Sequence, residues 1–165
     1  MRIIGIDPGT ATTGFSIIEI LNRNIQLLEY GIISTKAGLP QSTRLDQIAK
    51  DLQTIIEKWS PSEACIEKLY FEKNIKTAMT VSEARGVIIQ TLYSHGVNCH
   101  EMTPTQIKST ICGYGAADKQ MVQEMVKRTL NLKEIPTPDD AADAIAAALC
   151  LAYQTKTPIP QKTSV

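Results

Sequence analysis

The sequence has no apolar run long enough to cross a membrane. Its longest run, Ala144 to Ala152, falls well short of the roughly 20 residues that a membrane-spanning helix needs. The N-terminus also lacks the extended apolar segment and the small-residue cleavage site of a secretory signal peptide. We therefore expect neither membrane insertion nor secretion.

Cysteine is scarce and dispersed. The cysteines stand singly, without the paired spacing of a zinc site, at Cys65, Cys99, Cys112 and Cys150. Cys99 and His100, with His95 nearby, could suggest a metal site, but a strand residue beside a loop residue is the simpler interpretation. Reduced, structural thiols are typical of a cytoplasmic protein, which is the location that we expect.

Neither sign of charge is in excess. The 17 basic and 17 acidic side chains give a net charge of zero, which argues weakly against nucleic-acid binding. Their distribution is more informative, because residues 68–128 carry eight basic and five acidic side chains, whereas the segments on either side carry more acid than base. With 43% hydrophobic residues, the chain is expected to form one globular domain over residues 1–153, followed by a flexible tail over residues 154–165.

The hydrophobic pattern predicts an α/β fold. Strands are expected at 3–6, 15–21, 25–33, 64–66 and 97–102, and helices at 42–60, 74–95, from 104, at 121–130 and at 141–152. Three strands in quick succession indicate an antiparallel meander, and the later strands alternate with helices. We therefore expect a mixed five-stranded sheet, with three antiparallel strands plus two parallel ones, flanked by helices.

Two of the predicted strands end in a carboxylate. Asp7 follows the first, β-branched strand and precedes the turn residues Pro8-Gly9, so taken alone it could be no more than a turn residue. Glu67 ends the strand at 64–66 in the same way. If these two strands lie parallel and adjacent, the two acidic residues stand about 4.8 Å apart in backbone terms.

The last predicted helix carries an isolated acid. Every residue of 141–152 is apolar except Asp143, and an ionised carboxylate there is costly unless something compensates it. Its neighbours four positions away, Asp139 and Ala147, offer no ion pair. Asp139 and Asp140 could simply complement the helix dipole, but Asp143 lies beyond the first turn and shares a face with Asp140.

If the last helix packs over the edge where the two strands end, Asp7, Glu67, Asp140 and Asp143 converge. Four carboxylates cannot all stay ionised together without cations. Their hard oxygen ligands favour Mg²⁺ or Mn²⁺, and four of them could hold two ions about 3.5–4 Å apart. The pattern therefore predicts metal-dependent phosphoryl chemistry.

With these residues in view, the sequence resembles the RuvC family of Holliday-junction resolvases, which have a ribonuclease-H-like fold. The resemblance covers residues 1 to about 153. It rests on motifs in a fixed order, namely Ile4-Gly5-Ile6-Asp7-Pro8-Gly9, Ile66-Glu67, Lys73-Asn74, Ala84-Arg85-Gly86 and Asp140-Ala141-Ala142-Asp143-Ala144.

The resemblance implies roles for particular residues. It makes Asp7, Glu67, Asp140 and Asp143 the metal-binding catalytic residues, with two Mg²⁺ per site and Mn²⁺ as a substitute. Lys108 and Lys119 match basic residues near the scissile phosphate, and Tyr70 matches an aromatic position implicated in disrupting base pairing at the crossover. The residues expected to contact DNA are Tyr70, Lys73, Lys76, Arg85, Lys108 and Lys119.

The resemblance also implies partners. Members of the family act as homodimers that nick two opposed strands of a four-way DNA junction, together with the RuvA–RuvB branch-migration machinery, in recombination and repair. Symmetric cuts require a two-fold symmetric protein, and the helix predicted at 74–95 is the candidate interface.

Three alternatives remain to be weighed. Residues 5–10 also resemble the first phosphate loop of actin, hexokinase and Hsp70 ATPases, but the two related domains and glycine-rich adenosine motif of those proteins are missing. An inactive nucleic-acid binder is disfavoured by the four intact acids. A general ribonuclease H would differ in preferring RNA–DNA hybrid to a branched junction.

Overall fold

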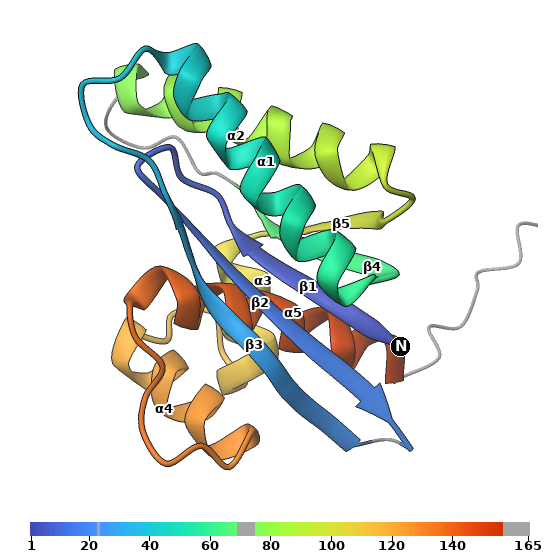
Figure 1. The fold of residues 1–165 in the computed structure, drawn as a ribbon. Coiled ribbons are helices and arrows are strands. Elements are labelled where there is room, and N and C mark those ends of the chain that lie inside the picture. The colour runs from blue at the N-terminus through green and yellow to red at the C-terminus, as the bar shows by residue number, and fades with distance from the viewer. Residues whose placement is uncertain (23, 69–74, 157–165) are drawn as a thin grey trace, which may run out of the picture.

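The computed structural model describes residues 1–22, 24–68 and 75–156, with the backbone alone for 75–77 and 156. Within these residues a five-stranded sheet has the order β3-β2-β1-β4-β5 (Figure 1). Its strands are β1 (Arg2–Asp7), β2 (Thr12–Leu21), β3 (Asn24–Ser34), β4 (Glu63–Glu67) and β5 (Asn98–Met102). The pairs β1–β2 and β2–β3 are antiparallel, whereas β1–β4 and β4–β5 are parallel, so the predicted mixed sheet is confirmed.

The central strand β1 is buried on both faces. Ile3, Ile4 and Ile6 are fully buried, as their β-branched run predicts. Because side chains alternate along a strand, Ile3 packs into the core on one face while Ile4 and Ile6 pack into the core on the other. Asp7, at the end of the strand, is only partly buried.

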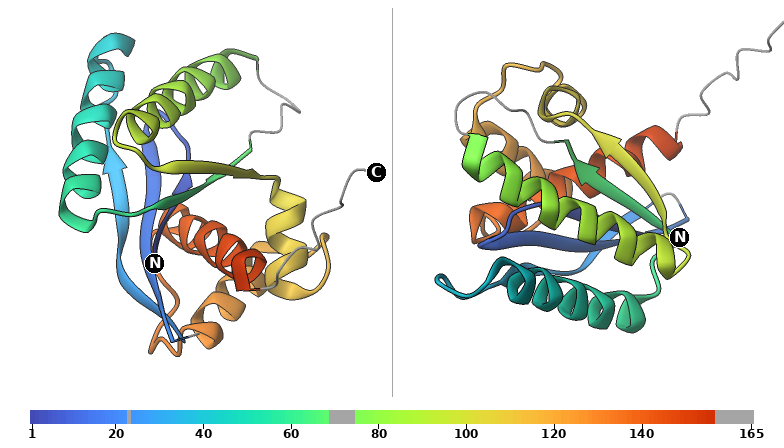
Figure 2. Two further views of the ribbon diagram at one scale, coloured as in Figure 1. Left: turned by 90° about the vertical axis from the view of Figure 1, so that its right-hand side faces the viewer. Right: turned by 90° about the horizontal axis from the view of Figure 1, so that it is seen from above.

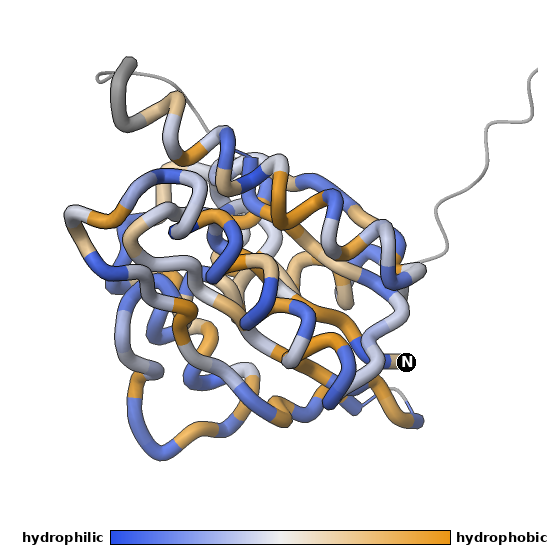
Figure 3. The backbone as a smooth tube through the Cα atoms, turned by 45° about the horizontal axis from the view of Figure 1, so that its top comes forward, coloured by the Kyte–Doolittle hydropathy of each residue, from blue (hydrophilic) through white to orange (hydrophobic). Residues whose placement is uncertain are grey.

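Helices α1 (Gln41–Trp59) and α2 (Ile75–Ser94) cover one face of the sheet (Figure 2). Hydrophobic residues of α1 recur every three or four positions, and Ile48, Leu52 and Ile56 are buried against the strands. Figure 3 shows hydrophobic and hydrophilic stretches alternating along the helices that lie over the sheet.

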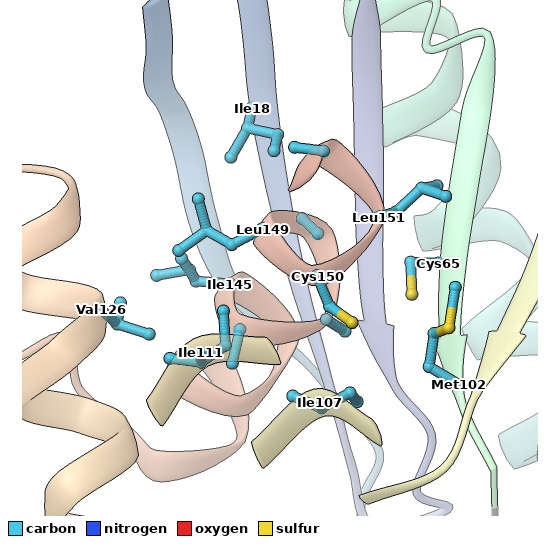
Figure 4. Packing of buried hydrophobic residues seen from close by; sticks show 14 of the residues in the cluster. Ile18, Cys65, Met102, Ile107, Ile111, Val126, Ile145, Leu149, Cys150 and Leu151 are labelled. Atoms are coloured by element: carbon cyan, nitrogen blue, oxygen red, sulfur yellow. The ribbon is translucent and has the colours of Figure 1, made fainter. Parts of the chain in front are cut away.

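Helix α5 (Asp139–Lys156) covers the other face, with α3 (Pro104–Cys112) and α4 (Lys119–Thr129) packed against it. Figure 4 shows Ile145 and Leu149 of α5 among side chains from β2, α3 and α4. Every residue from Ala144 to Ala152 is buried, as the apolar run predicts. The helix continues to Lys156, past the boundary predicted after Tyr153, so Gln154 is helical rather than the start of a tail.

The helix ends follow familiar capping rules. Thr103 and Gln106 form a reciprocal capping box at the start of α3, with Pro104 in its first turn, as expected from the sequence. The Asp118 carboxylate caps α4 by accepting a hydrogen bond from the Met121 backbone nitrogen at 2.8 Å. This cap places Lys119 at the first position of α4, next to the N-terminal end of α5.

Two further expectations can be compared with the structure. All four cysteines are free thiols. In the described ranges, we find no helix with the length and apolar character that crossing a membrane would require.

Candidate active site

Two strand ends place the first pair of acids side by side. Parallel strands β1 and β4 pair in a register that sets Ile6 opposite Ile66. The next residue of each strand is an acid, so Asp7 and Glu67 leave the same edge of the sheet from neighbouring strands. The adjacency on which the sequence prediction depended is therefore present.

Backbone contacts bring the start of α5 onto this edge. Gly14 of β2 pairs with Asp7 of β1, and a Cβ at Gly14 would stand 1.9 Å from the Asp140 carbonyl oxygen. Gly5 gives similar room to the Ala144 carbonyl oxygen, which would stand 2.0 Å from an added Cβ. Only glycine allows so close an approach of helix to sheet.

A buried hydrogen bond fixes the same contact. The Ser16 hydroxyl donates to the Ala144 carbonyl oxygen at 3.0 Å. This carbonyl lies one residue after Asp143, so the bond holds the first two turns of α5 against β2. Asp140 and Asp143 are thereby carried to the sheet edge where Asp7 lies.

We refer to Asp7, Glu67, Asp140 and Asp143 as the acidic cluster. The pKa of Asp7 is raised to about 8, first by burial and then by the charges of the other three carboxylates. The pKa of Glu67 is raised to about 7 by burial and then by Asp143, and that of Asp143 is raised mainly by burial. The four predicted residues therefore interact electrostatically in the folded chain.

Two lysines line a pocket together with Glu67 and Asp143 of the acidic cluster. The pocket has a volume of about 240 Å³ and an apolar wall. Its lining residues are Glu67, Pro104, Ile107, Lys108, Lys119, Val122, Asp143 and Ala146. The charges of Lys108 and Lys119 lower the pKa of Glu67, in opposition to burial. Both lysines therefore line the pocket beside Glu67 and Asp143, and their contact with DNA stays a prediction.

The donor set suits a hard divalent cation. Four carboxylates against two lysines leave the site negative, and the pKa of Asp7 is raised first by burial and then by this excess of negative charge. Among the described residues, no three His, Cys, Asp or Glu side chains already stand in a metal-binding arrangement. Instead the Lys119 ammonium lies 3.2 Å from an Asp143 carboxylate oxygen.

Comparison with known proteins identifies the family. The family model described as crossover junction endodeoxyribonuclease RuvC matches residues 3–151. The chain belongs to the RuvC family. The resemblance found in the sequence is thus confirmed, and the chain is a member of a family of nucleases that act on phosphodiester bonds.

Relatives of the RuvC family match over nearly the whole chain. Crossover junction endodeoxyribonuclease RuvC of Chloroflexus aurantiacus is 48% identical over 157 residues, which cover 95% of this chain and 96% of the relative. The structure of Thermus thermophilus RuvC in complex with a Holliday junction substrate has a TM-score of 0.89 at 29% identity, covering 94% and 95% of the two chains. The yeast mitochondrial Holliday junction resolvase, at 14% identity and a TM-score of 0.68 over 93% and 81% of the chains, shares the fold.

The other residues predicted to contact DNA are either partly buried or outside the described residues. Arg85 on α2 forms an ion pair with Glu101 on β5, and its side chain is 23% exposed. Its Nε atom is buried and has no hydrogen-bond partner among the described residues. Tyr70 and Lys73 lie outside the described residues, as does the side chain of Lys76. The DNA contacts of these four residues stay predictions.

The turn after Asp7 is held by residues that the sequence did not single out. The Thr10 hydroxyl donates to the Thr80 carbonyl oxygen of α2 at 2.8 Å, and the Thr35 hydroxyl donates to the Thr10 carbonyl oxygen at 2.6 Å. The Arg44 Nε in turn donates to the Thr35 hydroxyl at 2.7 Å. The spacing of threonines along a sequence does not indicate which distant residues they will bond, so these hydrogen bonds could not be predicted.

Asp139 is a second residue whose surroundings the sequence did not reveal. Its sequence position indicated only an acid in the first turn of a helix. In the structure its carboxylate contacts both Lys119 and Gln123 of α4. The contact depends on how α4 docks beside α5, which is a matter of tertiary packing.

Proposed function

We propose that this protein is a homodimeric, metal-dependent endonuclease that resolves four-way DNA junctions by paired, symmetric cuts. The observation that carries the proposal is the acidic cluster beside Lys108 and Lys119, in a chain of the RuvC family. A relative at 29% identity has been solved with a Holliday junction substrate, and it matches this chain over 94% of its length.

Asp7, Glu67, Asp140 and Asp143 would hold the divalent metal, proposed to be two Mg²⁺ ions with Mn²⁺ as a substitute. When bound, such ions lower the pKa of water and stabilise the charge that develops on a phosphodiester during in-line displacement. The protein's own contribution is to fix the carboxylates: two leave adjacent strand ends, and two lie on a helix whose backbone contacts the sheet.

The two lysines would act on the DNA backbone. Lys108 and Lys119 line the same pocket as Glu67 and Asp143, where a phosphate entering the site would meet positive charge. A cation close to developing negative charge stabilises the transition state more than the bound substrate. We therefore expect Lys119→Ala to reduce the cleavage rate more than the affinity for the junction.

The surface of α2 supports the proposed homodimer. Met79, Gly86 and Tyr93 recur every seven residues, and the side chains of Met79 and Tyr93 are 62% and 81% exposed. A glycine inside a helix is less favourable than alanine by about 1 kcal/mol, yet apart from the adjoining helix itself no described atom lies within 4 Å of a Cβ at Gly86. A helix of a second copy crossing at Gly86 would account for it.

The oligomeric state tests this interface directly. Gly86→Leu should leave the fold of one subunit unchanged, because Gly86 is exposed and an added Cβ there has open space around it. It should convert the dimer to a monomer in analytical ultracentrifugation, while Gln53→Leu on the exposed surface of α1 should leave the dimer intact. If Gly86→Leu remained a dimer, α2 would be ruled out as the interface.

The activity is tested with a labelled static four-way junction. The wild-type protein should make paired cuts in Mg²⁺ and none in chelator, and Asp7→Asn should bind the junction without cutting it. A linear duplex and an RNA–DNA hybrid serve as competing substrates. Preferential cutting of the hybrid would identify a ribonuclease H instead, and wild-type cutting by Asp7→Asn would refute the assignment of the acidic cluster.

We further propose that the protein works beside the RuvA–RuvB branch-migration complex in the cytoplasm, in DNA recombination and repair. The support is membership of the RuvC family. Co-purification with RuvA–RuvB assembled on a four-way junction, compared with RuvA–RuvB on linear duplex, would test this association.

A further inference from the structure

Lys119 lies between two carboxylates with different surroundings. Its ammonium nitrogen is 3.2 Å from Oδ2 of Asp143 and 3.2 Å from Oδ2 of Asp139. Asp143 belongs to the acidic cluster, and its side chain is 28% exposed. Asp139 stands outside the cluster, and its side chain is 64% exposed. The same lysine is thus shared between a residue of the proposed metal site and one beside it.

The carboxylate of Asp139 is held in place by α4. The Gln123 side-chain nitrogen donates to Oδ1 at 2.9 Å, while Oδ2 contacts Lys119. Gln123 and Lys119 are four positions apart, so they lie on one face of α4. Both oxygens of Asp139 therefore contact the same helix, and this fixes the orientation of the carboxylate.

The contact between Lys119 and Asp143 conflicts with metal binding. A cation on Asp143 would repel the ammonium of Lys119, because like charges a few ångströms apart disfavour each other. Conversely, an ammonium on Asp143 competes with the cation for the same oxygen. Lys119 needs a second anionic partner if it is to stay at the site when Asp143 binds a metal.

We propose that Asp139 is a positioning residue that holds Lys119 beside the active site and off Asp143 when the metal binds. The inference rests on the proposed function, because it takes Asp143 as a metal ligand. Asp139 does not line the pocket, and although its charge also raises the pKa of Asp143 directly, its contact with the site is made through Lys119. The larger part of its effect on metal binding should therefore require the lysine to be present.

The substitution Asp139→Asn keeps the size of the side chain and removes its charge. Lys119 then has Asp143 as its remaining anionic partner in this pair of contacts, so more Mg²⁺ is needed to displace it. We expect Mg²⁺ binding to weaken about three- to tenfold, which is within the coupling seen between residues in contact. Asp139→Glu, which keeps the charge, should recover part of the loss.

The experiment is a double-mutant cycle read out by calorimetric titration with Mg²⁺. The four proteins are the wild type, Asp139→Asn, Lys119→Ala and the double variant, each as the full chain. Asp139→Asn should weaken Mg²⁺ binding several-fold in the presence of Lys119 and clearly less in the Lys119→Ala background, where only the direct effect of its charge on Asp143 is left. Glu124→Gln removes a charge of α4 that pairs with Arg128, and as a matched control it should change Mg²⁺ affinity less than about twofold.

Each other outcome overturns the inference in a recognisable way. An equal loss of Mg²⁺ affinity in both backgrounds would show that Asp139 acts only through its own charge. If Asp139→Asn left the Mg²⁺ affinity unchanged and lowered the melting temperature in both backgrounds, Asp139 would serve only to stabilise the N-terminal end of α5. Cleavage of a four-way junction by the wild type at saturating Mg²⁺ is measured separately. Its absence, or the absence of any Mg²⁺ binding, would count against the proposed function itself.

Discussion

The position most sensitive to added volume is Gly14. In Gly14→Ala the new methyl carbon would stand 1.9 Å from the carbonyl oxygen of Asp140 and 2.4 Å from its carbonyl carbon. Both are backbone atoms, so no side chain can rotate away. Ordinary contact begins at 3.4 Å, and the start of α5 must therefore move about 1.5 Å from β2 to accommodate the methyl group.

Two magnitudes follow from this displacement. Forcing extra volume into a packed contact costs about 1–3 kcal/mol, which for a domain of this size lowers the melting temperature by roughly 2–12 °C. A 1 Å misplacement of catalytic groups can reduce the rate about 100-fold. Because Asp140 itself is displaced, we expect the loss of activity to be far larger than the loss of stability suggests.

The assay combines single-turnover cleavage of a labelled four-way junction at saturating Mg²⁺ with thermal unfolding followed by circular dichroism. Gly31→Ala on β3 is the matched control, since its added methyl meets only ring atoms of Phe15, at 3.1 and 3.3 Å. The control should cut at close to the wild-type rate. A Gly14→Ala protein that is folded and cuts as fast as the wild type would refute the idea that this backbone contact sets the site.

Three further predictions concern the acidic cluster, its support and the crossover residue. The folded pKa of Asp7, about 8, lies above its ordinary value, so the folded protein keeps a proton on Asp7 that the unfolded chain releases. In chelator, the free energy of unfolding should therefore fall as the pH rises from about 4 to about 8, by a few kcal/mol at most. Urea titrations across this pH range should show that Asp7→Asn removes a large part of the fall. A rise in stability over that range would contradict it. Ser16→Ala leaves the buried carbonyl of Ala144 without its hydroxyl donor and should lower the free energy of unfolding, measured in urea, by about 1–3 kcal/mol. As a control, Thr54→Ala on the exposed face of α1 should change the free energy of unfolding little. Equal effects of the two substitutions would refute the role of the buried bond. If the ring of Tyr70 stacks on a base, it contributes about 1–3 kcal/mol. Tyr70→Phe should then cut junctions with paired crossover bases at close to the wild-type rate, whereas Tyr70→Ala should cut them slowly and be partly rescued by mismatches at the crossover. Equal damage from the two substitutions would assign the chemistry to the hydroxyl.

The main elements could be predicted because their sequence signals are local. The β-branched run ending in Asp7 indicates a strand buried on both faces, and a lone acid within an apolar helix indicates that Asp143 has a special partner. Both the strand and the buried helix are present, and the two acids interact in the structure. The sequence could state only as a condition what brings Asp7 and Asp143 together, namely that the last helix packs over the edge where the strands end.

Contacts between distant elements could not be predicted in the same way. The ion pair of Arg85 with Glu101 joins α2 to β5, and that of Lys119 with Asp139 joins α4 to α5. Charged residues have many possible partners in a sequence, and tertiary packing selects among them. The end of α5 was also placed too early, because Gln154 and Thr155 are polar but continue the helix to Lys156.

The hydrogen bonds of Thr10 give the turn after Asp7 an unusual dependence on a distant helix. The hydrogen bond from the Thr10 hydroxyl to the Thr80 carbonyl would be strained if helix α2 moved along its axis, so it couples the turn to the helix. If two subunits meet through α2, a change in their mutual angle reaches both turns at once. In the proposed homodimer, the two active sites would then be linked through α2, and a substitution at Thr10 would loosen that link.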